Sequence, residues 1–155
     1  MRTAVTRTID APVELVFRTV ADIREFSKVQ DAIVDVAFLT DARYGVGTRF
    51  RETRRMGGRE VATELEVTEL VENERIRLVS DAGGTVWDSQ FTVAAGPGGT
   101  ILSLVMDARP YGLLARLTTR LTRGMVRRAL EKDMDAVKAY CERAGGGSPG
   151  AEPGD

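Results

Sequence analysis

The N-terminal part of the chain carries two hydrophobic patterns, which predict one strand followed by two helices. Apolar and polar residues alternate from Arg2 to Ile9, as in a strand with one buried face. In residues 13–20 the apolar side chains fall at i, i+3, i+4 and i+7, the spacing of an amphipathic helix, and Pro12 suits its start. Residues 23–29 predict a short second helix.

The middle of the chain alternates again in six segments that are divided by turn sequences. The glycine-rich stretches MGGR, AGGT and GPGG are typical of β-hairpin turns, and VENER marks a further turn. The segments between the turns cover residues 33–40, 48–56, 61–70, 75–80, 85–95 and 100–109. We therefore predict seven strands, of which the last six are antiparallel neighbours in chain order.

The last segment is helical in pattern, but its apolar stripe changes side. The two stripes are Leu114, Leu117, Leu121 and Met125, followed by Val126, Leu130, Met134, Val137 and Cys141. At about 100° per residue they lie on opposite sides of a straight helix. We therefore predict a break or sharp kink near Thr122–Gly124, with a flap over residues 111–121 and a core helix over residues 125–143.

Composition narrows the chemistry that the chain can perform. It has no histidine and one cysteine, Cys141, which excludes most hydrolase mechanisms, internal disulfides and thiolate metal sites. With 22 basic and 23 acidic residues it has no excess positive charge for nucleic acid. We expect no metal, no cofactor and no nucleic-acid partner.

The ends of the chain carry no targeting signal that we recognise. The N-terminus lacks the apolar run of a signal peptide, and no segment approaches the roughly 18 apolar residues of a membrane span. These features predict a cytoplasmic protein. Residues 144–155 are rich in glycine and proline and are expected to form a disordered tail.

The order of elements and several stretches resemble the START and birch-pollen-allergen superfamily, and most of all its polyketide cyclase/dehydrase-like branch. The stretches are IDAPVELVFRTVADI, GVGTRF, EVTELVENERIRL, the GGT before the last strand, and RRALEKDMDAVKAYCER. The resemblance spans about residues 2–143. It implies one α+β domain over residues 1–143 with the helix-grip fold, a seven-stranded curved antiparallel sheet around a long C-terminal helix, in the order β-α-α-β-β-β-β-β-β-α.

The resemblance also implies a class of ligand. Members of this superfamily bind hydrophobic small molecules between the sheet and the long helix; some carry lipids or sterols, some bind quinones, and some are polyketide aromatase/cyclases. A concave apolar site of this kind is a default ligand site in any fold. The alternative is that side chains fill the space between the sheet and the helix, so that no ligand cavity is present.

Strand alternation assigns the side chains that would face such a cavity. For Trp87 the interpretations of core residue and cavity wall both remain open. Together with positions on the flap and the core helix, the predicted ligand-binding set is Phe50, Leu65, Leu78, Ser80, Trp87, Ser89, Phe91, Leu104, Met106, Leu117, Leu121 and Met134.

Four polar residues are candidates for chemistry. Glu52 and Arg54 share the inner face with Phe50, about 6.5–7 Å apart along the strand. They either reach solvent at the strand end or anchor a ligand carboxylate or phenol. Arg109, where the last strand meets the flap, either pairs with an acidic or enolate oxygen or is a plain surface arginine, and the neighbouring Tyr111 would donate a proton in an enzyme.

Three functions follow from these features. The first is binding or transport of a hydrophobic lipid, quinone or aromatic polyketide-like molecule. The second is an aromatase/cyclase-like enzyme, and the third is a protein- or membrane-interaction module. The membrane contact would use a stripe of arginines on the flap; the alternative is that this stripe is a solvated helix face. The chain would be a monomer or homodimer. The stripe consists of Arg116, Arg120, Arg123 and Arg127.

Overall fold

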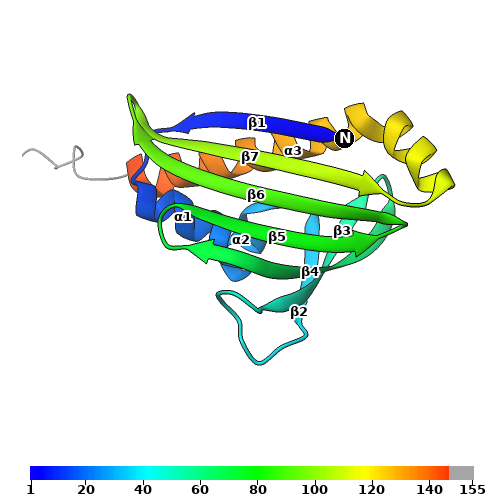
Figure 1. Cartoon of the computed structure of the whole chain (residues 1–155). Helices are drawn as coiled ribbons and strands as arrows, with labels where there is room; N and C mark the ends of the chain where they lie inside the picture. Colours follow the sequence, from blue (N-terminus) through cyan, green and yellow to red (C-terminus); the bar gives the residue numbers. More distant parts are fainter. Residues whose placement is uncertain (147–155) are drawn as a thin grey trace, which may run out of the picture.

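A computed structural model describes residues 1–146, in which a curved antiparallel sheet wraps three helices (Figure 1). The elements are β1 (Arg2–Ile9), α1 (Val13–Ala21), α2 (Ile23–Val29), β2 (Ile33–Phe38), β3 (Arg49–Met56), β4 (Arg59–Val71), β5 (Arg75–Ala82), β6 (Thr85–Gly96), β7 (Gly99–Pro110) and α3 (Leu113–Gly146). The predicted fold class, element order and strand positions are confirmed. The helix α3 continues beyond the predicted domain end at residue 143, and the rest of the predicted tail lies outside the described residues.

The seven strands form one sheet in the order β1-β7-β6-β5-β4-β3-β2. The chain thus folds as a meander from β2 to β7, and β1 closes the far edge by pairing with β7 along its whole length. The pairing register shifts between Val67 and Glu69 in β4, and between Ile33 and Asp35 in β2. Such irregularities bend a strand and increase its twist, and so they help to curve the sheet around the helices.

The short helices pack against one end of the concave face. Asp22 ends α1 and begins α2, because its carboxylate accepts a hydrogen bond from the backbone N–H of Arg24 at 3.0 Å. Phe17 of α1 is almost fully buried, together with Met134, Val137 and Cys141 of α3. This end of the molecule is therefore a filled hydrophobic core.

Of the two predicted alternatives for the C-terminal helix, a break or a kink, the break with its separate flap is wrong, because α3 is one continuous helix of 34 residues. Its axis bends instead, as Figure 1 shows where the yellow turns meet the orange ones. The hydroxyls of Thr118 and Thr122 donate hydrogen bonds back to the carbonyls of Leu114 and Thr118, an arrangement that often bends helices without interrupting them.

The face that the first half of α3 turns toward the sheet also differs from the prediction. Ala115 and Thr119 are buried there, while the leucine stripe points outward. The reason is the close approach of the β5–β6 turn: a Cβ added to Gly84 would lie 3.2 Å from the Cβ of Ala115. Only small side chains fit between a turn and a helix at this distance.

Candidate functional site

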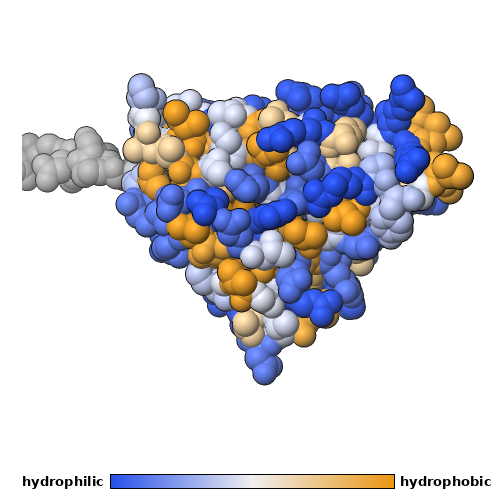
Figure 2. Space-filling model, viewed as in Figure 1, coloured by the Kyte–Doolittle hydropathy of each residue, from blue (hydrophilic) through white to orange (hydrophobic). Residues whose placement is uncertain are grey.

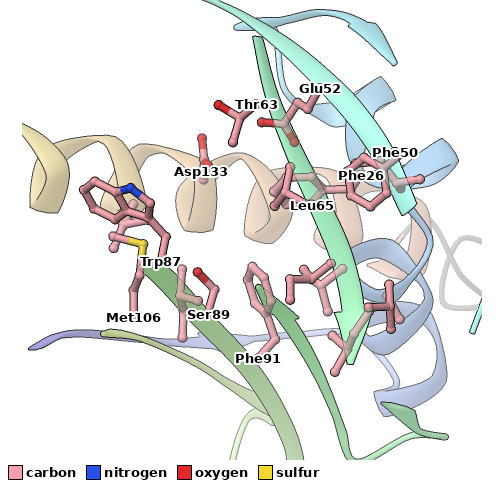
Figure 3. Close-up of a pocket in the computed structure, with 18 of the residues that line it drawn as sticks. Phe26, Phe50, Glu52, Thr63, Leu65, Trp87, Ser89, Phe91, Met106 and Asp133 are labelled. Carbon is pink, nitrogen blue, oxygen red and sulfur yellow. The ribbon is translucent and has the colours of Figure 1, made fainter. Parts of the chain in front are cut away.

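A cavity of about 300 Å³ lies between the concave face of the sheet and the middle of α3 (Figure 3). All of the strands β3 to β7 contribute to its wall, and α1, α2 and the β2–β3 loop close one end. It reaches the surface where lining residues are themselves exposed, at Tyr44, Met56 and Met125. The size and the concave position suit a small organic ligand.

Most of the wall is apolar and comes from side chains that strand alternation predicts to face inward. Trp87 and Phe91 of β6 point into the space with Ser89 between them (Figure 3). The register places Ser89 beside Leu78 on one neighbouring strand and Met106 on the other. The predicted residues on the wall are Phe50, Leu65, Leu78, Trp87, Ser89, Phe91, Leu104 and Met106. Trp87 is thus a cavity wall residue.

One side of the cavity carries a group of charges that we call the inner cluster: Glu52, Arg54 and Asp133. Arg54 donates from Nε to Glu52 at 2.5 Å, and from Nη1 and Nη2 to the two carboxylate oxygens of Asp133 at 3.0 and 2.9 Å. All three residues line the cavity. Because Asp133 belongs to α3, this bidentate pair ties the helix to β3.

The inner cluster has more negative than positive charge. Burial alone would lower the pKa of Arg54, but the hydrogen bonds and charges of Asp133 and Glu52 outweigh it, so the pKa lies above its ordinary value. Arg54 therefore stays charged, and with both acids ionised the cluster carries a formal charge of −1. Three of the five N–H groups of the Arg54 guanidinium donate within the cluster, so two remain available. The carboxylates also have lone pairs that accept no hydrogen bond from residues 1–146, so the cluster can both donate to and accept from a ligand.

Asp133 and Thr63 were not among the predicted site residues. Thr63 lies on the inner face of β4, above the cavity and near Glu52 in Figure 3. The sequence contains a signal for Asp133, since it is three residues after Leu130 and four before Val137, on the apolar face of the helix. A charged residue within an otherwise apolar stripe indicates a buried partner.

Residues 1–142 match the family described as "Polyketide cyclase / dehydrase and lipid transport". The chain belongs to this family. Because the match covers nearly all of the domain, it confirms the resemblance found in the sequence. No curated protein matches the chain.

Solved structures share the fold of this family member at low sequence identity. TTHA0849 from Thermus thermophilus is 20% identical with a TM-score of 0.76, over 93% of this chain and 99% of that one. Ara h 8.0201 is 14% identical with a TM-score of 0.73, over 91% and 97%. The di-domain ARO/CYC BexL from the BE-7585A biosynthetic pathway is 18% identical with a TM-score of 0.75, over 96% of this chain but 51% of that one.

Four residues of the predicted ligand-binding set do not line the cavity of this family member. Leu117 and Leu121 point to solvent because the small residues of α3 face the sheet. Met134 is fully buried in the core, about 100° around the helix from Asp133. Ser80 is buried opposite Trp87 near the β5–β6 turn, where β5 no longer contributes to the cavity wall.

The candidates Arg109 and Tyr111 also lie outside the cavity. Since Ala108 is buried on the inner face of β7, Arg109 points outward, toward Asp88 at 3.3 Å. The exposed Tyr111 donates a hydrogen bond to Asp81 at 2.9 Å, and this bond raises its pKa. Neither side chain is placed to meet a ligand in the cavity.

On the outer face, Asp88 joins two arginines in what we call the outer cluster: Arg77, Asp88 and Arg109. Arg77 donates to both carboxylate oxygens of Asp88, at 2.8 and 2.5 Å. These hydrogen bonds lower the pKa of Asp88 although its burial acts in the opposite direction. The cluster links the neighbouring strands β5, β6 and β7.

Within residues 1–146, no group of three or more histidine, cysteine or carboxylate side chains is arranged to hold a metal ion. In the same range no helix is long and apolar enough to cross a membrane.

Proposed function

We propose that this protein binds or transports a hydrophobic small molecule such as a lipid, a quinone or an aromatic polyketide-like compound. The observation that supports this is an open cavity of about 300 Å³ with mainly apolar walls. Protein cores are normally filled, and an empty apolar space loses the packing contacts that would stabilise the fold. Such a space is therefore expected to have a function, and a bound ligand would restore the contacts. We also expect that the carrier acts in the cytoplasm.

The inner cluster narrows the kind of ligand. A carboxylate ligand would bring a second negative charge to a cluster that already has a net negative charge. It would also lose its hydration in the cavity, which disfavours its binding. A hydroxyl or phenol instead donates to a free carboxylate lone pair and accepts from Arg54. Of the two predicted ligand groups, a carboxylate and a phenol, we therefore propose the phenol or another neutral hydroxyl group, carried on an apolar body.

Fluorescence of Trp87, the only tryptophan, provides the test. Pairs of ligands that differ only in the head group, such as a long-chain alcohol and the matching fatty acid, should be compared with hydroxylated quinones and aromatic polyketides. The alcohol or phenol of each pair should change the emission at lower concentration than the acid. No response to any of these compounds would contradict the proposal.

A matched pair of variants locates the binding. Ser89 and Gln90 are neighbours on β6, and only Ser89 lines the cavity. Ser89→Phe should fill the space and abolish the fluorescence response, whereas Gln90→Phe, on the outer face, should leave it intact. An equal loss in both variants would indicate damage to the strand instead of a filled cavity.

A second candidate, an aromatase/cyclase-like enzyme, is favoured by the carboxylate of Glu52 on the cavity wall. Glu52 would take a proton from the carbon beside a ketone while Arg54 faces the enolate oxygen. The carbanion electron pair would form a carbon–carbon bond to the carbonyl carbon of a second ketone. The oxygen of that ketone would then take the proton back from Glu52. In this case Glu52→Gln should stop product formation from a poly-β-ketone while the compound still binds.

A further inference from the structure

Five large apolar side chains form an exposed stripe along the first half of α3. At about 100° per residue they cover an arc of roughly 120° on the side away from the sheet. Their exposed fractions are 84% for Leu113, 78% for Leu114, 56% for Leu117, 76% for Leu121 and 50% for Met125. Figure 2 shows apolar surface beside hydrophilic surface at the end of the molecule where α3 begins.

This apolar stripe is not explained by packing within the described residues. The side of α3 that meets the sheet carries the small residues Ala115 and Thr119, which are buried. Burial of a leucine stabilises a structure by about 1.5–3 kcal/mol, so a row of outward leucines leaves a large apolar surface unused. A contiguous exposed patch of this kind marks an interaction site.

Arginines flank the stripe, and no acidic residue accompanies them. Between residues 113 and 130 the chain has five arginines and no aspartate or glutamate. Arg127 forms an ion pair with Glu131 at 3.1 Å, but Arg116, Arg120 and Arg123 form no ion pair within residues 1–146. These three arginines project on one side of the leucine stripe, about 115° around the helix from its centre. Arg128, which also forms no ion pair within residues 1–146, follows the stripe beyond Met125. The helix is therefore amphipathic on its outer surface, with an apolar side and a cationic side.

We propose that the first half of α3 docks on an anionic lipid bilayer. The leucines would enter the boundary between head groups and acyl chains, and the arginines would contact the lipid phosphates. Charge argues against a second copy as the occupant. A twofold contact through the stripe would bring the arginines of the two copies together without an acidic residue of the same segment to pair with them.

The docking surface adjoins the cavity. Met125 belongs to the exposed stripe and also lines the cavity, and Val126 follows it on the wall. A bilayer against the stripe would therefore lie beside the place where the cavity reaches the surface. Transfer of a ligand between bilayer and cavity rests on the proposed function, but the docking itself does not.

Vesicle co-sedimentation of the full chain tests the docking. The protein should bind vesicles that contain phosphatidylglycerol and should bind pure phosphatidylcholine vesicles much more weakly. Each arginine near an anionic surface strengthens binding by roughly fivefold, so R116Q/R120Q should weaken it by roughly twenty-five-fold. Leu117→Glu should weaken it at least about tenfold, since it removes a buried leucine from the bilayer.

Matched variants separate docking from general effects of charge and polarity. R18Q/R143Q removes the same charge from two exposed helical positions elsewhere, and Val46→Glu changes another exposed apolar residue. Neither should reduce vesicle binding. Absence of binding to anionic vesicles, or binding that Leu117→Glu leaves unchanged, would overturn the proposal. A dimer in sedimentation equilibrium that Leu117→Glu dissociates would also overturn it and assign the stripe to a second copy.

Discussion

The inner and outer clusters use the same chemical groups in opposite proportions on opposite faces of one sheet. The inner cluster has two carboxylates around one arginine, and the outer cluster has two arginines around one carboxylate. Their formal charges are thus −1 and +1. The first joins a helix to a strand at the cavity wall, and the second joins three adjacent strands at the surface.

The solvent exposure of the charged side chains determines how much each cluster contributes to the stability of the protein. The two clusters differ in the exposure of their arginines: the side chain of Arg54 is 22% exposed, while those of Arg77 and Arg109 are 41% and 60% exposed. Their carboxylates are similarly buried, at 11% for Glu52, 13% for Asp133 and 9% for Asp88. Charges near water interact weakly, because solvent screens them and can replace a lost partner. Charges that are largely buried depend on each other, since no water compensates for a missing partner. The inner cluster should therefore be the more sensitive of the two.

The largest effect is expected for Arg54→Met. Removal of this arginine leaves the carboxylates of Glu52 and Asp133 facing each other without a cation, which should lower the free energy of unfolding by about 3 kcal/mol at pH 7. Urea unfolding of the wild type and of Arg54→Met at pH 7 measures this loss.

The matched change in the outer cluster is Arg77→Met. It also removes a bidentate arginine, but a second and largely exposed arginine, Arg109, remains beside the buried carboxylate of Asp88. We expect a loss of only about 1 kcal/mol. Equal losses for Arg54→Met and Arg77→Met would show that burial does not distinguish the clusters.

An intermediate effect is expected for Glu52→Gln, in ligand binding more than in stability. The amide still accepts from Arg54, and the remaining pair of Arg54 and Asp133 is neutral, so unfolding should change little. A ligand hydroxyl that donates to the Glu52 carboxylate loses a charge-assisted hydrogen bond, worth about 2 kcal/mol or roughly thirtyfold in affinity. Titration of Trp87 fluorescence with an alcohol and with its matching fatty acid measures the change; the preference for the alcohol should narrow.

Sequence periodicity predicted the fold well because hairpin turns and strand alternation are local signals. The same alternation correctly placed Trp87, Ser89 and Phe91 around the cavity, since the side of a strand follows from its register. It also placed Glu52 and Arg54 together on the inner face. These successes need only the spacing of residues within one strand.

The failures all require distances between elements that are remote in the sequence. By hydrophobicity alone, Leu117 and Leu121 are better candidates for the buried side of the helix than Ala115 and Thr119. The close approach of Gly84 to the helix leaves room only for small side chains on that side, which excludes the leucines. Asp133 meets Arg54 across 79 positions of sequence, which no local pattern specifies. Arg109 was assigned to the mouth of the cavity by its place in the chain, although the alternation with Ala108 turns it outward.

The effect expected for Asp88→Asn is as small as that of Arg77→Met, and its pH dependence identifies the outer cluster. Asp88 stands directly opposite Asp107 in the register of β6 and β7, and the two arginines offset this like-charge pair. Loss of the Asp88 charge should lower the free energy of unfolding by about 1 kcal/mol at pH 7, because its partners are half exposed. Asp107→Asn, the matched control on the next strand, should cause no loss, since it removes the opposing charge.

The dependence on pH follows from the lowered pKa of Asp88, which Arg77 causes by its hydrogen bonds. An unfolded aspartate titrates near pH 4, so the folded protein holds this carboxylate ionised to lower pH than the unfolded chain does. The stabilisation is complete above about pH 4 and is lost as the pH falls toward the folded pKa. Urea unfolding of the wild type and Asp88→Asn should therefore differ at pH 7 and converge below about pH 4. A difference that persists unchanged at low pH would mean that the asparagine disturbs packing, and that the ion pairs of the outer cluster contribute little.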